Sequence, residues 1–122
     1  MISISLDALR DDIDVEGIGR RFFTADERDY LNCPSSGEKR KRFFYIWTRK
    51  EALVKAAGTG VDAIASVNVL DGAVTMEDES GLIGKYCLHT LSPPAGYVLS
   101  LALQTPMAAV PERIQEIRSS RA

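Results

Sequence analysis

The amino-acid sequence predicts an α+β fold in which one long helix packs on a small antiparallel sheet. A single helical pattern covers residues 38–57, and most of the chain that follows has the alternation and turns of β-strands. The chain has 122 residues, of which 45% are apolar and 26% charged, so one globular domain with its own core is expected.

The helices are expected in the first half of the chain. Segment 14–31 predicts two short helices, the second with Thr24 as its N-cap and Glu27 as the capping-box partner three residues later. Ser35 has the same pattern ahead of the long helix. Gly58 predicts the end of that helix at about residue 57, because glycine accepts the left-handed conformation.

The strands are expected to begin the chain and to fill its second half. Their predicted ranges are 2–6, 66–70, 73–76, 85–91 and 97–103. Asp71-Gly72 predicts a hairpin between the second and third of these strands. We therefore expect residues 1–105 to form the domain, and residues 106–122 to form a C-terminal tail with a short helix at 112–118.

Charge and composition exclude several classes of function. The net charge is −2, and the basic block Lys39–Arg42 lacks interleaved aromatic residues, so we expect no nucleic-acid partner. No run of about 18 apolar residues and no signal-peptide pattern occur, which predicts a cytoplasmic protein without a membrane partner. Cys33 and Cys87 lack metal-finger spacing; we expect two free buried thiols, although the sequence leaves one disulfide open.

Two charges fall on the apolar face of the long helix. On a helical wheel, Lys50 lies near the middle of this face and Glu51 lies between Trp47 and Phe44. A core-facing carboxylate is costly unless a positive group meets it. Glu51 therefore either pairs with Lys55 one turn later, the commoner arrangement, or binds a cation while Lys55 meets phosphate oxygens.

Two motifs decide between these alternatives. The run from Trp47 to Lys55, WTRKEALVK, looks like the W-x-x-K-E-[AS]-x-x-K signature of the 4′-phosphopantetheinyl transferases, and a G-x-G follows it. Upstream, the run from Arg21 to Glu27 resembles the R-F-F-[ST]-x-x-E segment of the same family. The resemblance covers about residues 2–103 and is closest to the second half of the long, two-half type, whereas the chain has the length of the short holo-ACP synthase type.

The resemblance implies a magnesium-dependent transfer of 4′-phosphopantetheine from coenzyme A to a serine of an acyl or peptidyl carrier protein. Glu51 and Lys55 would be the catalytic residues, and Lys50 with Lys55 would bind the coenzyme A phosphates. Asp7 and Glu51 would bind Mg²⁺. Ser5 stands where the family's G-[IV]-D-[LIV]-E strand motif has its central aspartate, so one metal ligand is missing.

This departure leaves alternatives for the molecule as a whole. The chain is either a fragment without its first half, a single half that works as a homo-oligomer, or a non-catalytic relative that keeps the fold and weak coenzyme A or carrier-protein binding. An exposed half-interface predicts a dimer or trimer in each case. The basic block at Lys39–Arg42 is either a solvated face or steers the acidic surface of a carrier protein.

Overall fold

The computed structural model describes residues 2–32, 35–91 and 96–105 of the chain. The elements follow in the order β1 (Ile2–Ala8), α1 (Val15–Phe22), α2 (Ala25–Leu31), α3 (Ser36–Ala57), η1 (Val61–Ile64), β2 (Ala73–Glu77), β3 (Ile83–Leu91) and β4 (Tyr97–Thr105). The predicted α+β class is confirmed. Cys33, the predicted tail at residues 106–122 and its short helix lie outside the described residues.

The helix boundaries follow from the capping residues. The side chain of Thr24 accepts from the backbone N–H of Glu27, whose carboxylate accepts in return from the backbone N–H of Thr24. The hydroxyl of Ser35 caps α3 at its start, and Gly58 ends this helix at φ 72°. Each cap satisfies backbone groups that a helix end leaves without partners, which confirms the helix starts and stops predicted from the sequence.

The four strands form one antiparallel sheet in the order β1-β4-β3-β2. The first and last strands of the chain are therefore neighbours, and β1 lies at one edge. In the β1–β4 register, Ser5 lies opposite Ser100 and Ile4 lies opposite Leu101. Because side chains alternate between the faces of a strand, Ser5 points to the helix-covered face and Ile4 to the other face.

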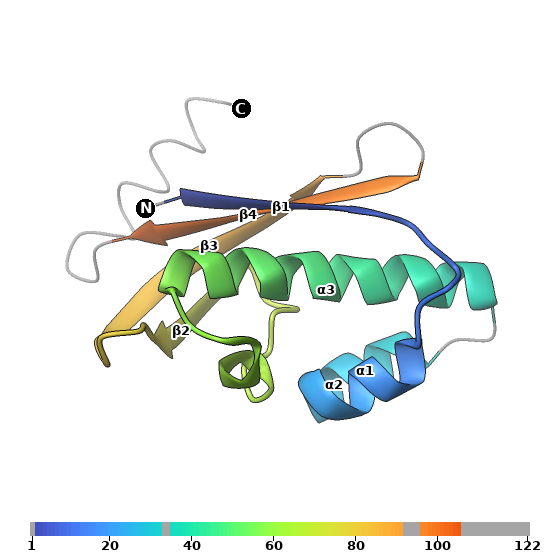
Figure 1. Cartoon of the computed structure of the whole chain (residues 1–122), viewed down its shortest axis with the longest axis horizontal. Helices are drawn as coiled ribbons and strands as arrows, with labels where there is room; N and C mark the ends of the chain where they lie inside the picture. Colours follow the sequence, from blue (N-terminus) through green and yellow to red (C-terminus); the bar gives the residue numbers. More distant parts are fainter. Residues whose placement is uncertain (1, 33–34, 92–95, 106–122) are drawn as a thin grey trace.

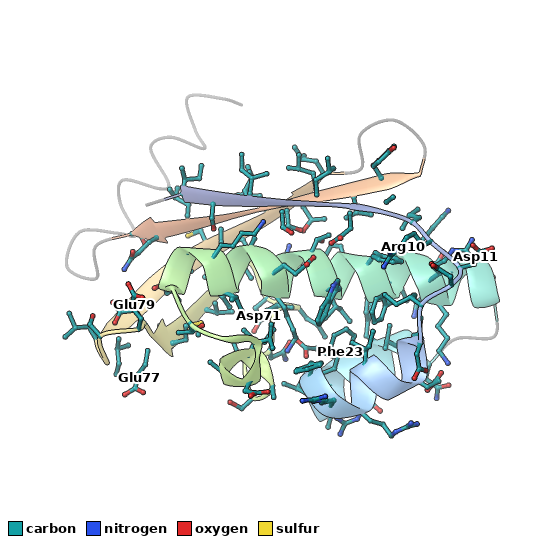
Figure 2. All side chains as sticks on the ribbon, viewed as in Figure 1. Arg10, Asp11, Phe23, Asp71, Glu77 and Glu79 are labelled. Atoms are coloured by element: carbon teal, nitrogen blue, oxygen red, sulfur yellow. The ribbon has the colours of Figure 1, made fainter. Side chains whose placement is uncertain are left out.

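The molecule has three layers, with α3 in the middle. Figure 1 shows α3 lying along one face of the sheet, with α1, α2 and the η1 segment on its opposite side. The helix is therefore buried on most of its circumference between Phe43 and Leu53. Phe23, at the end of α1, lies between α3 and the short helices (Figure 2) and is 2% exposed. The large apolar side chains that are fully buried include Phe43, Phe44, Ile46, Leu53, Ile64, Val69 and Tyr86.

The predicted strand at 66–70 is wrong. This segment follows η1 as an irregular stretch and belongs to no sheet. Its backbone groups are bound by buried side chains instead: Arg49 donates to the carbonyl of Val69, and the N–H of Val69 donates to Glu27. Asp71-Gly72 consequently makes no hairpin, and the hairpin of this region joins β2 to β3 through residues 78–82.

The outer face of the sheet, away from α3, is apolar. The exposed side chains Ile2, Ile4 and Leu6 of β1 lie beside the partly exposed Leu103, Leu101 and Leu99 of β4. An apolar surface of this kind is typical of an interaction site. Among the described helices, none combines the length and the apolar character needed to cross a membrane.

Candidate functional site

The candidate site lies between the edge strand β1 and the middle of α3. Side-chain hydrogen bonds connect the two elements. The hydroxyl of Ser3 donates to the carbonyl of Ala52, that of Ser5 donates to Oε1 of Glu51 at 3.3 Å, and Nζ of Lys55 donates to the carbonyl of Ile4 at 3.2 Å. The small serine side chains let α3 approach the strand closely.

Asp7 and Glu51 come together at this seam. Burial, a side-chain hydrogen bond with Asp7 and the negative charge of Asp7 raise the pKa of Glu51, whereas the Ser5 hydroxyl and Lys55 lower it, and the net result is a pKa of about 8. The Oδ2 atom of Asp7 is buried and has no hydrogen-bond partner. Near neutral pH the two carboxyl groups therefore share one proton, and a cation that takes the place of this proton would let both groups ionise.

Lys55 places a positive charge near the seam but forms no ion pair with its carboxylates. Its side chain is exposed and contacts β1 through the carbonyl of Ile4 rather than through a carboxylate. Among the described residues, no ion pair joins Lys55 to Glu51. The i,i+4 ion pair between Glu51 and Lys55, one of the two alternatives left open by the sequence, is therefore not among the ion pairs of the described residues. No ion pair within α3 neutralises Glu51 there.

The donors at this seam fit a hard divalent cation. Carboxylate and hydroxyl oxygens are the ligands that Mg²⁺ prefers, and Mg²⁺ commonly takes only one or two protein carboxylates, with water and phosphate oxygens completing its shell. The buried Oδ2 atom of Asp7 is a ligand atom without an internal partner. No cluster of three or more His, Cys, Asp or Glu side chains arranged for a metal occurs in the described part of the chain. A cation here would therefore rest on Asp7, Glu51 and Ser5.

Lys50 does not belong to this seam, and its predicted contact with coenzyme A phosphates is corrected here. Its side chain is 0% exposed and Nζ lies 2.7 Å from Oε1 of Glu27, which is equally buried. The same Nζ donates to the carbonyls of Ile64 and Val67. Burial lowers the pKa of Lys50, although Glu27 opposes this effect. An ammonium group enclosed in this way has no donor left for a ligand.

A second buried polar group was not predicted from the sequence. Arg49 donates to the carbonyls of Val69 and Asp71 and to the hydroxyl of Thr90. Ser100 bonds to both Thr90 and Thr48, which extends the network across the helix–sheet interface. The helical wheel identifies Lys50 and Glu51 as charged residues on the apolar face of α3. It contains no information about the partners of Arg49, because these partners lie on distant strands and loops.

The basic block Lys39–Arg42 lies at the far end of α3 from the carboxylates. Lys39 pairs with Glu16, and Arg42 pairs with Glu38 at 3.4 Å. A pocket of about 310 Å³ opens beside this end of the helix, lined by Arg10, Asp11, Ile13, Val15, Lys39 and Arg40. Figure 2 shows Arg10 and Asp11 beside the N-terminal part of α3. The pocket shares no lining residue with the carboxylate seam.

Comparisons with known proteins agree on a single family. The family model of the 4′-phosphopantetheinyl transferase superfamily matches residues 4–102. A curated relative, the 4′-phosphopantetheinyl transferase HetI of Nostoc sp., is 37% identical over 68 residues, which are 56% of this chain and 29% of the relative. The chain thus spans less than a third of the length of that relative.

The fold has a solved counterpart. The holo-[acyl-carrier-protein] synthase AcpS of Thermotoga maritima superposes with a TM-score of 0.52 at 17% identity, over 85% of this chain and 64% of that chain. At this identity the likeness concerns the fold alone. The family match extends from the edge strand β1 into the last strand, β4, and includes all of α3, so it contains both sides of the carboxylate seam. The chain belongs to the 4′-phosphopantetheinyl transferase superfamily.

Proposed function

We propose that the seam between β1 and α3 is a magnesium site for the transfer of phosphopantetheine from coenzyme A to a serine of a carrier protein. The observation that carries this proposal is the meeting of Asp7 and Glu51, where a buried carboxylate oxygen lacks a partner and the pKa of Glu51 is raised to about 8. Perturbed carboxylates of this kind gather at functional sites. Membership of the family supports the reaction class.

Magnesium bound here would neutralise charge on the coenzyme A pyrophosphate and thereby favour attack at phosphorus. Asp7 and Glu51 would hold it, with the Ser5 hydroxyl as a neutral third oxygen. The serine hydroxyl of the carrier protein attacks the β-phosphorus, and the bond from that phosphorus to the bridging oxygen breaks. The 3′,5′-ADP leaves with the bridging oxygen.

The protein's own groups then act on the proton and the charge. Glu51 would be ionised beside a bound cation, and in that form its carboxylate, which faces the same seam, accepts the proton of the attacking serine directly or through water. Lys55, one turn further along α3 and exposed, donates to an oxygen of the α-phosphate and stabilises the charge that develops on the leaving group. Trp47 packs against the aromatic core with a ring–ring distance of 6.1 Å to Phe43, and so supports α3 without touching the substrate.

The test is transfer to a carrier protein, measured by mass spectrometry. We expect an apo carrier protein incubated with this chain, coenzyme A and Mg²⁺ to gain one phosphopantetheine group, and we expect Glu51→Gln to lower the rate about 10³-fold. A chelator should abolish transfer by the unaltered chain. No mass gain with several acyl and peptidyl carriers would contradict the proposal.

A second candidate function is a non-catalytic relative that binds coenzyme A or a carrier protein weakly. Ser5 favours it, because a neutral hydroxyl contacts Glu51 at the position where the family motif has a charged ligand. Recovery of transfer in Ser5→Asp would indicate a degenerate site, whereas inactivity of both forms would indicate a missing half.

We also propose that the chain self-associates through the outer face of the sheet. Ile2, Ile4 and Leu6 are more than half exposed, at 59%, 53% and 55%, and a leucine of β4 lies beside each of them. Apolar area of this extent is unfavourable in water. Light scattering should report a dimer or trimer, and Ile4→Lys should shift it toward the monomer.

A further inference from the structure

The buried pair of Glu27 and Lys50 joins three parts of the fold at one point. Glu27 is on α2, Lys50 is on α3, and both side chains are 0% exposed. Lys50 also donates to the carbonyl of Ile64, the last residue of η1, and to the carbonyl of Val67 in the segment after η1. The three N–H donors of the ammonium group therefore have three acceptors, which are the Glu27 carboxylate and the carbonyls of Ile64 and Val67.

Glu27 is equally saturated. Its Oε1 accepts from the backbone N–H of Thr24 as well as from Lys50, and its Oε2 accepts from the backbone N–H of Val69 at 2.8 Å. A single carboxylate thus caps α2, fixes the segment before β2 and neutralises the lysine of α3. With every polar atom satisfied, the pair admits one arrangement of α3 against its neighbours.

The position of this pair on α3 matters for the carboxylate seam. Lys50 and Glu51 are consecutive, so their side chains leave the helix about 100° apart: Lys50 toward α2 and the 64–69 segment, Glu51 toward β1. With side chains at about 5–6 Å from the helix axis, a rotation of roughly 20° would move the Glu51 carboxylate by about 2 Å. A displacement of that size would break its contact with Ser5 and separate it from Asp7.

We propose that Glu27 and Lys50 are positioning residues, whose buried ion pair fixes the rotation of α3 and thereby holds Glu51 against Ser5 and Asp7. This inference rests on the proposed function of the carboxylate seam. It assigns to the lysine of the K-E pair a role through geometry rather than through contact with phosphate. The same pair also explains why a charge can lie in the middle of the apolar face of α3.

Binding of Mn²⁺ alone, followed by electron paramagnetic resonance, tests the positioning role in the full chain. We expect Lys50→Met to raise the Mn²⁺ dissociation constant about tenfold or more, as loss of a supporting residue commonly does. Met76→Ala, in the far edge strand β2, removes buried apolar surface away from the seam and is the matched control for lost stability. It should bind Mn²⁺ as the unaltered chain does.

The double variant Glu27→Gln with Lys50→Met separates positioning from stability. It leaves no uncompensated buried charge, so its unfolding midpoint should recover relative to Lys50→Met alone. The contacts of residue 50 with α2 and with the carbonyl of Val67 remain absent, however. If these contacts position Glu51, Mn²⁺ binding should stay weak in the double variant. Recovery of the Mn²⁺ affinity together with the midpoint would overturn the proposal.

A measurement without metal distinguishes failure of the positioning role from failure of the proposed function. If the unaltered chain binds no Mn²⁺, the cation site itself is refuted. The backbone amide chemical shifts of Ser5 and Asp7 then decide the positioning role. They should change in Lys50→Met and in the double variant but not in Met76→Ala, and unchanged shifts in the first two variants would refute it.

Discussion

The hydroxyl of Ser5 donates to Oε1 of Glu51 across 3.3 Å, and this contact joins the edge strand β1 to the middle of α3. Ser5 is 4% exposed, so the hydrogen bond is formed away from bulk water. Burial and Asp7 favour the protonated form of Glu51 and raise its pKa, whereas the hydrogen bond from Ser5 favours the charged form. The site therefore contains two carboxyl groups in an environment that disfavours ionisation of both at once.

Replacing Ser5 by aspartate should strengthen cation binding and weaken the metal-free fold. A third carboxylate adds a ligand for Mg²⁺, and we expect the dissociation constant to fall about tenfold, by analogy with other ligand-sphere changes. Without metal the additional like charge should lower the free energy of unfolding by about 1–3 kcal/mol. Calorimetric titration with Mg²⁺ and urea unfolding in chelator measure the two effects, with Ser5→Ala as the uncharged control. An unchanged Mg²⁺ affinity in Ser5→Asp would place the cation elsewhere.

The metal-free protein should become less stable as the pH rises from about 4.5 to about 8. The pKa of Glu51 is about 8 in the folded chain and near 4.5 when unfolded, so the folded state binds more protons in this window. Stability falls with pH wherever the unfolded state binds fewer protons. Because Glu51 is partly exposed, solvent screening reduces the effect to on the order of 1–2 kcal/mol. Urea unfolding at several pH values in chelator checks the slope, and Glu51→Gln should flatten it.

Asp7→Asn should stabilise the metal-free chain while it weakens the site. The amide removes one of two facing negative charges, and its N–H can donate to Glu51, so the free energy of unfolding at pH 8 should rise by about 1 kcal/mol. Loss of a carboxylate ligand should raise the Mg²⁺ dissociation constant at least tenfold. Opposite signs for stability and affinity are typical of a functional site. A loss of both would show that Asp7 is structural.

Much of the fold could be predicted from local signals. The caps at Thr24 and Ser35 and the stop at Gly58 act within one turn of helix, so the residues that specify them are adjacent in the sequence. The alternating segments that became β3 and β4 are long and regular enough to identify as strands. The seam of Asp7 and Glu51 was found because two motifs resemble a family, and spacing alone would not have joined β1 to α3.

The errors arose where tertiary contacts replace local ones. Residues 66–70 alternate like a strand, but Glu27 and Arg49 bind the backbone of Val69 and leave it no neighbour in the sheet. The family resemblance predicts Lys50 at the coenzyme A phosphates, beside Glu51 in the same motif. Consecutive helix positions point about 100° apart, and the buried acceptor for Lys50 is 23 residues earlier, on a different helix, as Glu27.

Lys55→Ala should separate catalysis from stability. The side chain is exposed and its described contact is a single hydrogen bond to the carbonyl of Ile4, so the free energy of unfolding should change by less than about 0.5 kcal/mol. If Lys55 stabilises the leaving group, kcat should fall about 10²-fold, because the charge it meets develops in the transition state. Lys55→Arg keeps the charge and should retain much of the activity. Kinetics at varied coenzyme A concentration measure kcat and KM separately. A rise confined to the KM of Lys55→Ala would mean that Lys55 only binds the substrate. An unchanged kcat/KM would show that Lys55 is not part of the site.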